Sequence, residues 1–354
     1  MSGNFAAGMK NTLTKATGGI LRPRWLWFGV TDNCNSRCSM CNIWQQPVTK
    51  EPLTPREIET TLKDPVFQGI EYIINSGGET TLRADLKEVM LAEFSALPGA
   101  TIQLSTNGLL PERMLDAVKF GIERGMKLSV GTSLDGIGPA HDAVRGVPGN
   151  FQKVDYLLTE LKKLRAGYPG LDIGFGFTLM DTTLANLEAT RDYARKMDVG
   201  FLMQWFNQSP FYSNAGDVKL DREKMLEAVK SYPDPILRDM WLDWLHGKSI
   251  RFNCFALHSF CVLKCNGDIS PCLSKWDVCA GNVRENTPSE IWQSEAARQA
   301  RRGVRACEGC LNSWGTDWSF RTSGYPYLTH LLTHPASTAR RIVAKLGRIC
   351  GCAK

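Results

Sequence analysis

The sequence predicts an α/β protein, with a parallel sheet flanked by helices and a small cysteine-rich region at its C-terminal end. Between residues 25 and 220, apolar strand-like runs alternate with helix-like stretches six times, which is the pattern of a parallel sheet with helices outside it. From residue 253 helical patterns thin out and seven cysteines lie between positions 254 and 310, so a metal-stapled fold is expected there. The repeats alone leave open whether the sheet is doubly wound or a curled partial barrel.

The predicted elements follow in order along the chain. Strands are expected at residues 25–31, 71–75, 101–105, 127–133, 172–179 and 201–205, and helices at 85–94, 111–124, 151–165 and 187–197. A further helix begins at Pro55, because Thr54 and Glu57 form a capping box around a proline at the first helical position. A helical segment over 221–246 leads to the cysteine-rich region, where Asn266-Gly267 predicts a hairpin turn.

Composition and cysteine usage indicate an intracellular enzyme. The chain has 354 residues, of which 43% are hydrophobic and 22% charged, ordinary values for a soluble enzyme with one large domain and an appendage. Twelve cysteines are unusual in a reducing compartment unless many of them bind metal. No secretory signal is visible, and no apolar stretch approaches the ~20 residues of a membrane span, so a cytoplasmic location is expected.

Positive charge is concentrated at the two ends of the chain. Nine basic residues lie there, more than the net charge of +6, so the central body is slightly acidic. They are Lys10, Lys15, Arg22, Arg24, Arg340, Arg341, Lys345, Arg348 and Lys354. Helically spaced apolar residues in the C-terminal tail predict either an amphipathic helix peripheral to the inner membrane face or a solvated, frayed end. Cys350 and Cys352 are either acylation sites or spare thiols. Nucleic-acid binding is not expected, because the body lacks a basic patch interleaved with aromatic residues.

Three cysteines, Cys34, Cys38 and Cys41, form a C-x3-C-x2-C motif directly after the first strand. Iron–sulfur clusters are normally held by four cysteines, yet no fourth cysteine lies nearby and the nearest histidine is His141. Three thiolates would bind three irons of a cubane cluster and leave the fourth iron open to a substrate or cofactor. Structural zinc is the alternative, but closed zinc sites need four ligands.

Polar motifs follow the next three strands. They are Gly77, Gly78 and Glu79 after the second strand, Asn107 after the third, and Ser133 and Arg145 at and after the end of the fourth. Glycines let a ligand approach the backbone closely, a carboxylate suits an ammonium group, and an arginine can bind a carboxylate bidentately. Active sites of parallel α/β folds lie at the carboxyl ends of the strands, so these residues are expected to share one site.

Together these motifs resemble those of the radical S-adenosylmethionine (SAM) enzymes. The likeness rests on the cysteine spacing, on Gly-Gly-Glu with Thr80 where the family has proline, and on the Thr-Asn-Gly and Ser-Leu-Asp-Gly…His-Asp…Arg-Gly stretches. The resemblance implies a partial (β/α)6 TIM-like barrel. It also implies that the open iron of a [4Fe–4S] cluster chelates the amino and carboxylate groups of SAM, and that an electron from the cluster cleaves SAM to a 5'-deoxyadenosyl radical.

The resemblance also assigns cofactor contacts. The implied SAM-binding residues are Met40, Gly77, Gly78, Glu79, Asn107, Ser133 and Arg145. Glu79 would hold the amino group of SAM, and Met40 stands where the family usually has an aromatic residue and would pack against adenine. Arg145 would pair with a carboxylate, or else form a surface salt bridge. A flavodoxin- or ferredoxin-type reductant is the implied electron donor.

Four further cysteines resemble the auxiliary-cluster region of the SPASM and Twitch subgroups of this family. They are Cys254, Cys272, Cys307 and Cys310. No cysteine follows until position 350, so the shorter Twitch form is expected, with the four holding a second [4Fe–4S] cluster. Cys261 or Cys279 could replace one of these ligands, Cys265 could be a buried apolar residue, and a four-cysteine zinc site is the alternative.

The expected organisation is a basic extension over 1–24, the barrel over 25–220, a helical bridge over 221–252, the auxiliary domain over 253–320 and a basic tail over 321–354. The expected function is a radical SAM oxidoreductase that removes hydrogen from an unactivated C–H bond of a small-molecule, sugar-type or lipid-linked substrate. No catalytic side chain is assigned. The pocket candidates, with packing as the other interpretation, are Trp205, Asn207, Tyr212 and Arg145.

Three alternatives to this function stay open. An epimerase or a maturase of a ribosomal peptide is one, although only 24 residues precede the first strand and peptide modifiers often carry a leader-binding domain there. A radical methyltransferase is disfavoured, because no cobalamin domain precedes the barrel. A non-catalytic iron–sulfur electron carrier is the alternative from another class, but it would not need the polar motifs at successive strand ends.

Overall fold

Six parallel strands form the centre of the computed structural model, which describes residues 5–214, 221–250, 252–308 and 310–323. The strands are β1 Trp25–Thr31, β2 Tyr72–Gly77, β3 Thr101–Ser105, β4 Lys127–Ser133, β5 Asp172–Leu179 and β6 Gly200–Trp205. Each lies within two residues of its predicted position. The predicted amphipathic tail, with Cys350 and Cys352, lies outside the described residues.

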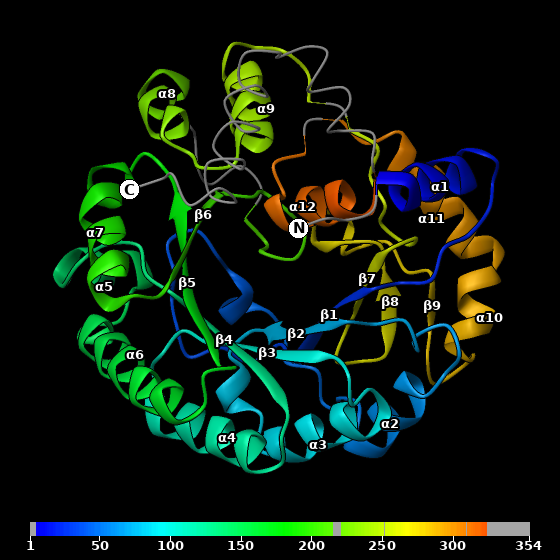
Figure 1. The fold of residues 1–354 in the computed structure, drawn as a ribbon, viewed down its shortest axis with the longest axis horizontal. Helices are drawn as coiled ribbons and strands as arrows, with labels where there is room; N and C mark the ends of the chain where they lie inside the picture. Colours follow the sequence, from blue (N-terminus) through cyan, green and yellow to red (C-terminus); the bar gives the residue numbers. More distant parts are fainter. Residues whose placement is uncertain (1–4, 215–220, 251, 309, 324–354) are drawn as a thin grey trace, which may run out of the picture.

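The strands follow one another in chain order, and the sheet curves into a partial barrel whose outer face is covered by helices (Figure 1). The helices are α2 Pro55–Leu62, α3 Leu86–Ala96, α4 Pro111–Glu123, α5 Pro139–Arg145, α6 Asn150–Gly167 and α7 Leu187–Met197. The capping box at the start of α2 is confirmed, since Thr54 and Glu57 bond reciprocally. The core lies between sheet and helices, where Phe28, Ile73 and Leu104 are fully buried.

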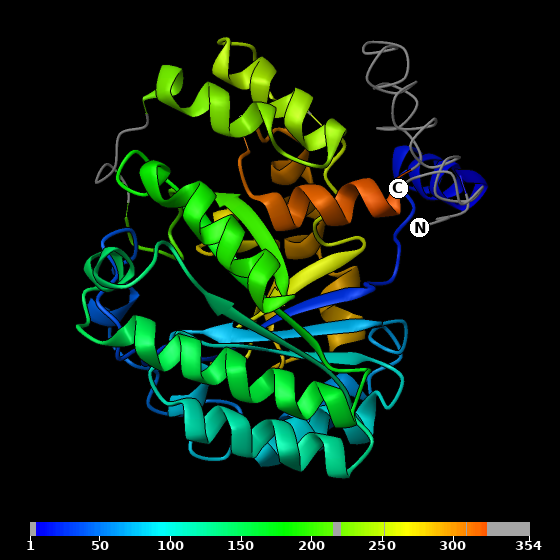
Figure 2. The ribbon, with the colours of Figure 1, turned by 60° about the vertical axis from the view of Figure 1, so that its left-hand side comes forward.

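The C-terminal cysteine-rich region continues the barrel sheet instead of forming a separate layer. Strand β7 (Phe260–Leu263) pairs in parallel with β1, and β8 (Asp268–Ser270) and β9 (Gly281–Asn282) extend the same nine-stranded sheet in antiparallel fashion. Gly267 has a φ of +95° in the predicted hairpin turn. Helices α10 (Pro288–Gln293), α11 (Glu295–Arg305) and α12 (Ser313–Thr322) complete the region (Figure 2).

Two stretches differ from the sequence-based expectation. The bridge consists of two helices, α8 (Arg222–Lys230) and α9 (Pro235–Leu245), because prolines at 233 and 235 cannot continue a helix that is already formed. The N-terminal extension contains a helix, α1 (Phe5–Ala16), which packs against α12, with Asn11 donating to the Thr322 carbonyl at 3.1 Å. None of the helices in the described ranges has the length and apolar character needed to cross a membrane.

A buried carboxyl on α3 gives the fold a pH dependence. Glu93 is fully buried, it accepts a hydrogen bond from the Asn75 side chain at 2.8 Å, and burial raises its pKa to about 8. Because the folded-state pKa lies above the unfolded value, the stabilisation is complete below about pH 4.5 and is lost as pH rises through about 8. We expect the free energy of unfolding to fall by about 2–3 kcal/mol between pH 6 and pH 9.

Urea unfolding at the two pH values measures this effect. Glu93→Gln keeps an oxygen that can accept from the Asn75 side chain, and it removes the titrating carboxyl group. Most of the fall in unfolding free energy between pH 6 and pH 9 should therefore disappear, and the variant should be more stable than the parent at pH 9. Glu88→Gln, on the exposed face of the same helix, is the matched control and should retain the parent's pH dependence. An unchanged slope in Glu93→Gln would show that Glu93 is not its source.

Candidate functional site

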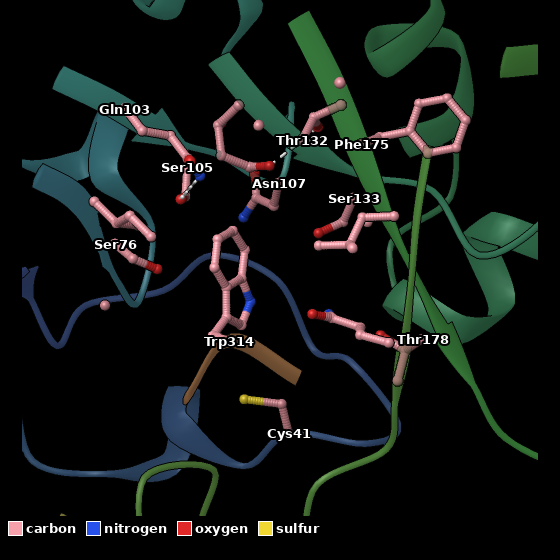
Figure 3. A pocket seen from close by; sticks show the side chains of 18 of the residues that line it. Cys41, Ser76, Gln103, Ser105, Asn107, Thr132, Ser133, Phe175, Thr178 and Trp314 are labelled. Carbon is pink, nitrogen blue, oxygen red and sulfur yellow. Dashed lines mark hydrogen bonds between the residues drawn. The ribbon is translucent and has the colours of Figure 1, made fainter. Parts of the chain in front are cut away.

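A cavity of about 450 Å³ opens at the carboxyl ends of the parallel strands. Its walls are the inner faces of β1 to β6 and the segments that follow β1, β2, β3, β4 and β6. Trp314 of α12 projects into it between Cys41 and Asn107 in the view of Figure 3. Cavities of this size accommodate cofactors and drug-sized ligands. All the residues predicted for the first cluster, for SAM and for the substrate pocket line this one cavity.

The loop that carries the three motif cysteines is held in place by its backbone. The N–H groups of Arg37 and Ser39 donate to the carbonyls of Arg145 and Val144, at 3.0 and 2.9 Å. These are the last carbonyls of α5, which have no partner within the helix itself. The sequence interpretation took α5 for part of a loop, and the structure shows that this short helix anchors the cysteine loop.

The three motif cysteines, Cys34, Cys38 and Cys41, are all half-buried and free. Burial raises the pKa of Cys34 to about 11 and that of Cys41 to about 12, so these thiols keep their protons near neutral pH until a metal displaces them. No three Cys, His, Asp or Glu residues of the described chain converge closely enough to hold one metal ion.

The glycine pair lets β2 end directly against the cysteine loop. A Cβ on Gly77 would lie 2.1 Å from the Thr31 carbonyl oxygen, and one on Gly78 would lie 2.1 Å from that of Asn33. Instead, Gly78 N–H donates to Thr31 and Glu79 N–H donates to Asn33, both at 2.7 Å. Close backbone packing therefore requires glycine at both positions. Because glycine has no side chain, the backbone is also exposed to the cavity here.

Glu79 joins the ends of β2 and β3. Its Oε1 accepts hydrogen bonds from the N–H and hydroxyl of Thr81, at 3.1 and 2.6 Å, and from the hydroxyl of Thr106 at 2.7 Å. Its Oε2 accepts one bond, from Asn107 N–H at 2.6 Å. Burial raises the pKa of Glu79. Since each carboxylate oxygen has two acceptor sites, Oε2 keeps the capacity to accept a hydrogen bond from a ligand ammonium group.

Arg145 belongs to a buried ion pair under the cysteine loop. Its Nη2 lies 2.5 Å from Asp135 Oδ2, and its Nη1 donates to Cys38 Sγ at 3.6 Å. Asp135 is fully buried, and its Oδ1 accepts from Thr178 N–H at 2.8 Å. Although burial lowers it, the pKa of Arg145 is raised overall by Asp135 and Cys38. Arg145 therefore faces the cavity and does not form the surface salt bridge that was the other interpretation.

His141 has a positioning role beside this pair. Burial lowers its pKa to about 4, so the ring is neutral. Its Nδ1 accepts from Asp135 N–H at 3.1 Å, which places the ring proton on Nε2, 3.1 Å from the Asn150 side-chain oxygen. Asn150 in turn donates to the Asn107 carbonyl at 3.0 Å. The loops after β3 and β4 are thus locked together.

The remaining predicted residues occupy the cavity wall nearest β6. Met40 is buried among apolar side chains and also lines the cavity. Trp205 packs edge-to-face against Trp241 at 5.7 Å, so it serves both the core and the cavity wall. Asn207 and Tyr212 line the cavity as well.

The cavity floor was missed by sequence reasoning. Inward-facing glycines on β4, β5 and β6 leave space where barrel interiors are normally filled by bulky side chains; they are Gly131, Gly174, Gly176 and Gly200. The polar groups beside them are those of Gln103, Ser129, Asp172 and Gln204. The sequence of β5 carried a signal, because glycine and phenylalanine alternate along it with the period of a strand whose inner face is bare.

The four predicted auxiliary cysteines come from separate segments and lie within electrostatic range of one another, although no three of them are close enough to hold one metal ion. They are Cys254, Cys272, Cys307 and Cys310. The pKa of Cys272 is raised by burial and then by Cys254 and Cys310, and burial with Cys254 and Cys307 raises that of Cys310 to about 12. Cys254 and Cys272 contact the same apolar cluster as Cys34 and Cys41, a cluster that includes Trp27 and Phe260. The two cysteine sets therefore share one aromatic core.

The other three cysteines of this region have different surroundings. Cys261 is fully buried on β7 in the apolar core, and its pKa is raised by burial. Cys265 is also buried and donates to Asp32 at 3.2 Å. Cys279 is exposed, with its sulfur 3.5 Å from the Gly281 carbonyl.

The fold and this cysteine-lined cavity are those of a radical SAM protein. The pattern of the radical SAM superfamily matches residues 29–191, and that of the SPASM iron–sulfur cluster-binding domain matches residues 254–311. The chain belongs to the radical SAM superfamily and carries a C-terminal SPASM domain. These two assignments imply SAM and a [4Fe–4S] cluster as cofactors, together with the auxiliary cluster chemistry of SPASM enzymes.

Known relatives catalyse several different reactions. The Fe-coproporphyrin III synthase of Methanosarcina barkeri is 29% identical over 306 residues, covering 77% of this chain and 73% of the relative. The GTP 3',8-cyclase of Aquifex aeolicus is 27% identical over 309 residues, covering 78% and 93%. Streptococcus suis SuiB bound to S-adenosylmethionine has a TM-score of 0.62 at 15% identity, covering 83% of this chain and 70% of SuiB. The last comparison supports the fold alone.

Proposed function

We propose that this protein is a radical SAM oxidoreductase that acts on a neutral, hydroxyl-rich small molecule of the sugar type, free or lipid-linked. The observation that carries the proposal is the cavity in which the cysteine loop, the Gly-Gly-Glu turn and the ends of β3 and β4 meet. The residues present fit the cofactor. Three thiolates lie in one loop, Glu79 Oε2 can accept from an ammonium group, and Gly77 and Gly78 leave the wall bare.

When bound, SAM and the two clusters would supply the chemistry, which would be reductive cleavage of SAM to methionine and a 5'-deoxyadenosyl radical, hydrogen abstraction from the substrate, and transfer of one substrate electron to the auxiliary cluster with loss of a proton. The chain's own residues hold and orient the reactants. In this proposal Cys34, Cys38 and Cys41 bind the first cluster, and Glu79 orients the amino group of SAM. The auxiliary cluster is held by Cys254, Cys272, Cys307 and Cys310.

The charge of the cavity disfavours an anionic substrate, because Glu79 and Asp172 line it. Arg145 is the single basic residue among the described residues that line the cavity. Its guanidinium group is paired with Asp135. A nucleoside triphosphate or a porphyrin with several carboxylates would need several cations to offset its burial. The cavity floor instead offers the amides of Gln103 and Gln204 and the hydroxyl of Ser129, which suit substrate hydroxyl groups.

Two finer points rest on sequence alone. The first is that the substrate is linked to a lipid, and the second is that the basic tail contacts a membrane surface. Both are inferred from the sequence of the tail, which lies outside the described part of the chain. A ribosomal peptide substrate and a redox-neutral epimerisation are the competing proposals, and a product analysis would separate them from oxidation.

Iron content and SAM cleavage test the proposal first. Protein reconstituted anaerobically should contain about eight irons per chain, as expected for two [4Fe–4S] clusters, and should release 5'-deoxyadenosine from SAM under dithionite. Cys307→Ala with Cys310→Ala should lose about four irons and still cleave SAM, while failing to form oxidised product. About eight irons without SAM cleavage would support an electron carrier instead, and zinc in place of iron would contradict the cluster assignment.

A further inference from the structure

Helix α1 brings a buried cation to the auxiliary cysteines. Lys15, in its last turn, is 5% exposed although lysine is rarely buried. Its Nζ donates to the Cys254 carbonyl and to the Asn253 side-chain oxygen, and it lies 4.7 Å from the centre of the Phe255 ring. The helix precedes both matched family regions, which begin at residues 29 and 254.

The position of Lys15 is fixed from several sides. Arg305 donates to the Lys15 carbonyl at 3.0 Å, and Asn11 ties α1 to the Thr322 carbonyl of α12 at 3.1 Å. The same α12 carries Ser319, whose hydroxyl oxygen accepts from Phe255 N–H at 2.9 Å and so holds the segment that follows Cys254. The ammonium group is therefore held beside Cys254 by the same packing that builds the cysteine site.

The charge of Lys15 is not cancelled by a carboxylate. Among the described residues no acidic side chain forms an ion pair with it, and the charged groups that act on it are Cys254 and Arg305. The hydrogen-bond partners of its Nζ are two oxygen acceptors, which suit an ammonium group. An uncompensated charge in a buried position acts more strongly on its neighbours than one in water.

We propose that Lys15 raises the reduction potential of the auxiliary cluster and so makes that cluster a better electron acceptor. A cluster bound by four thiolates becomes more negative on reduction, and potentials of such clusters are set by nearby charge, hydrogen bonding and solvent exposure. A fixed cation beside Cys254 stabilises the reduced form more than the oxidised form. The inference rests on the proposed ligand set and on the proposed oxidation, and it concerns a residue outside that ligand set.

A redox titration followed by electron paramagnetic resonance tests the inference. Full-length protein carrying both clusters is titrated, and the signal missing from a Cys34→Ala, Cys38→Ala, Cys41→Ala variant identifies the first cluster. Lys15→Met should shift the midpoint potential of the auxiliary cluster to more negative values and leave that of the first cluster unchanged. Lys15→Arg, which keeps the charge, should stay near the parent.

Lys10→Met is the matched control, because Lys10 lies on the same helix and is exposed; it should leave both potentials unchanged. If Lys15→Met loses iron, Lys15→Gln, which retains a hydrogen-bond donor, supplies the measurement. An unchanged auxiliary potential in a Lys15 variant with full iron content would overturn the inference alone. Absence of a second cluster from the parent protein would overturn the inference and the proposed ligand set together.

Discussion

Replacing Cys34, Cys38 and Cys41 together by alanine should abolish 5'-deoxyadenosine release, lowering it at least about 1,000-fold, while the protein remains folded. The three thiolates are the ligands proposed for the first cluster, and without the cluster no electron reaches SAM. The loop should keep its course, because Arg37 and Ser39 hold it to α5 through backbone groups that the substitutions do not touch. Release is measured by chromatography under dithionite, and the fold by circular dichroism.

Cys279→Ala is the control for this experiment, since Cys279 is exposed and belongs to neither proposed ligand set. It should leave SAM cleavage and iron content unchanged. The triple variant should also lose about four of eight irons, the ones that Cys307→Ala with Cys310→Ala retains. SAM cleavage by the triple variant at a rate comparable to the parent would contradict the assignment of the first cluster site.

Arg145→Met should lower the free energy of unfolding by about 3–5 kcal/mol, the usual cost of leaving one partner of a buried ion pair uncompensated. Asp135 has no exposed surface, and Arg145 is the cation beside it at 2.5 Å. We also expect weaker SAM binding, because the same guanidinium group contacts the Cys38 sulfur and lines the cavity. Urea unfolding of iron-free protein measures the stability term separately from cluster binding.

The double variant Asp135→Asn, Arg145→Met closes a mutant cycle and should recover part of the lost stability, since no buried charge is then left unpaired. Arg298→Met removes the exposed pair with Glu295 and should change the unfolding free energy by less than about 1 kcal/mol. If Arg145→Met were no more destabilising than Arg298→Met, the pair would not stabilise the fold.

Much of the fold was predictable because its signals are local. The strands of the barrel appear as short apolar runs, and the capping box at Thr54 and the Asn-Gly turn at Gly267 are set by neighbouring residues. Helix α5 was not predicted, because it is short and its last carbonyls are bonded by the distant cysteine loop. The bridge was taken for one helix because the prolines that divide it were given too little weight.

The residues of the candidate site were predicted from the sequence, but the form of the cavity and the contacts between its residues were not. Motifs after successive strands were expected to meet, since the carboxyl ends of parallel strands share one edge, and all of them do line one cavity. The structure adds the second acceptor site of Glu79, the buried pair of Asp135 with Arg145, and the glycine-lined floor. These depend on which face of each strand is turned inward and on what lies opposite.

The sequence by itself determined the strand and helix pattern, the cysteine spacings and the order of the polar motifs, because each is written in residues close together along the chain. Only the tertiary structure decided that β7 continues the barrel sheet beside β1 and that Lys15 reaches Cys254 across 239 positions. It also decided that Trp314 of α12 lines the cavity. Such contacts arise from packing between distant segments, and burial then fixes the charge and hydrogen bonding of each group in ways that local sequence patterns do not specify.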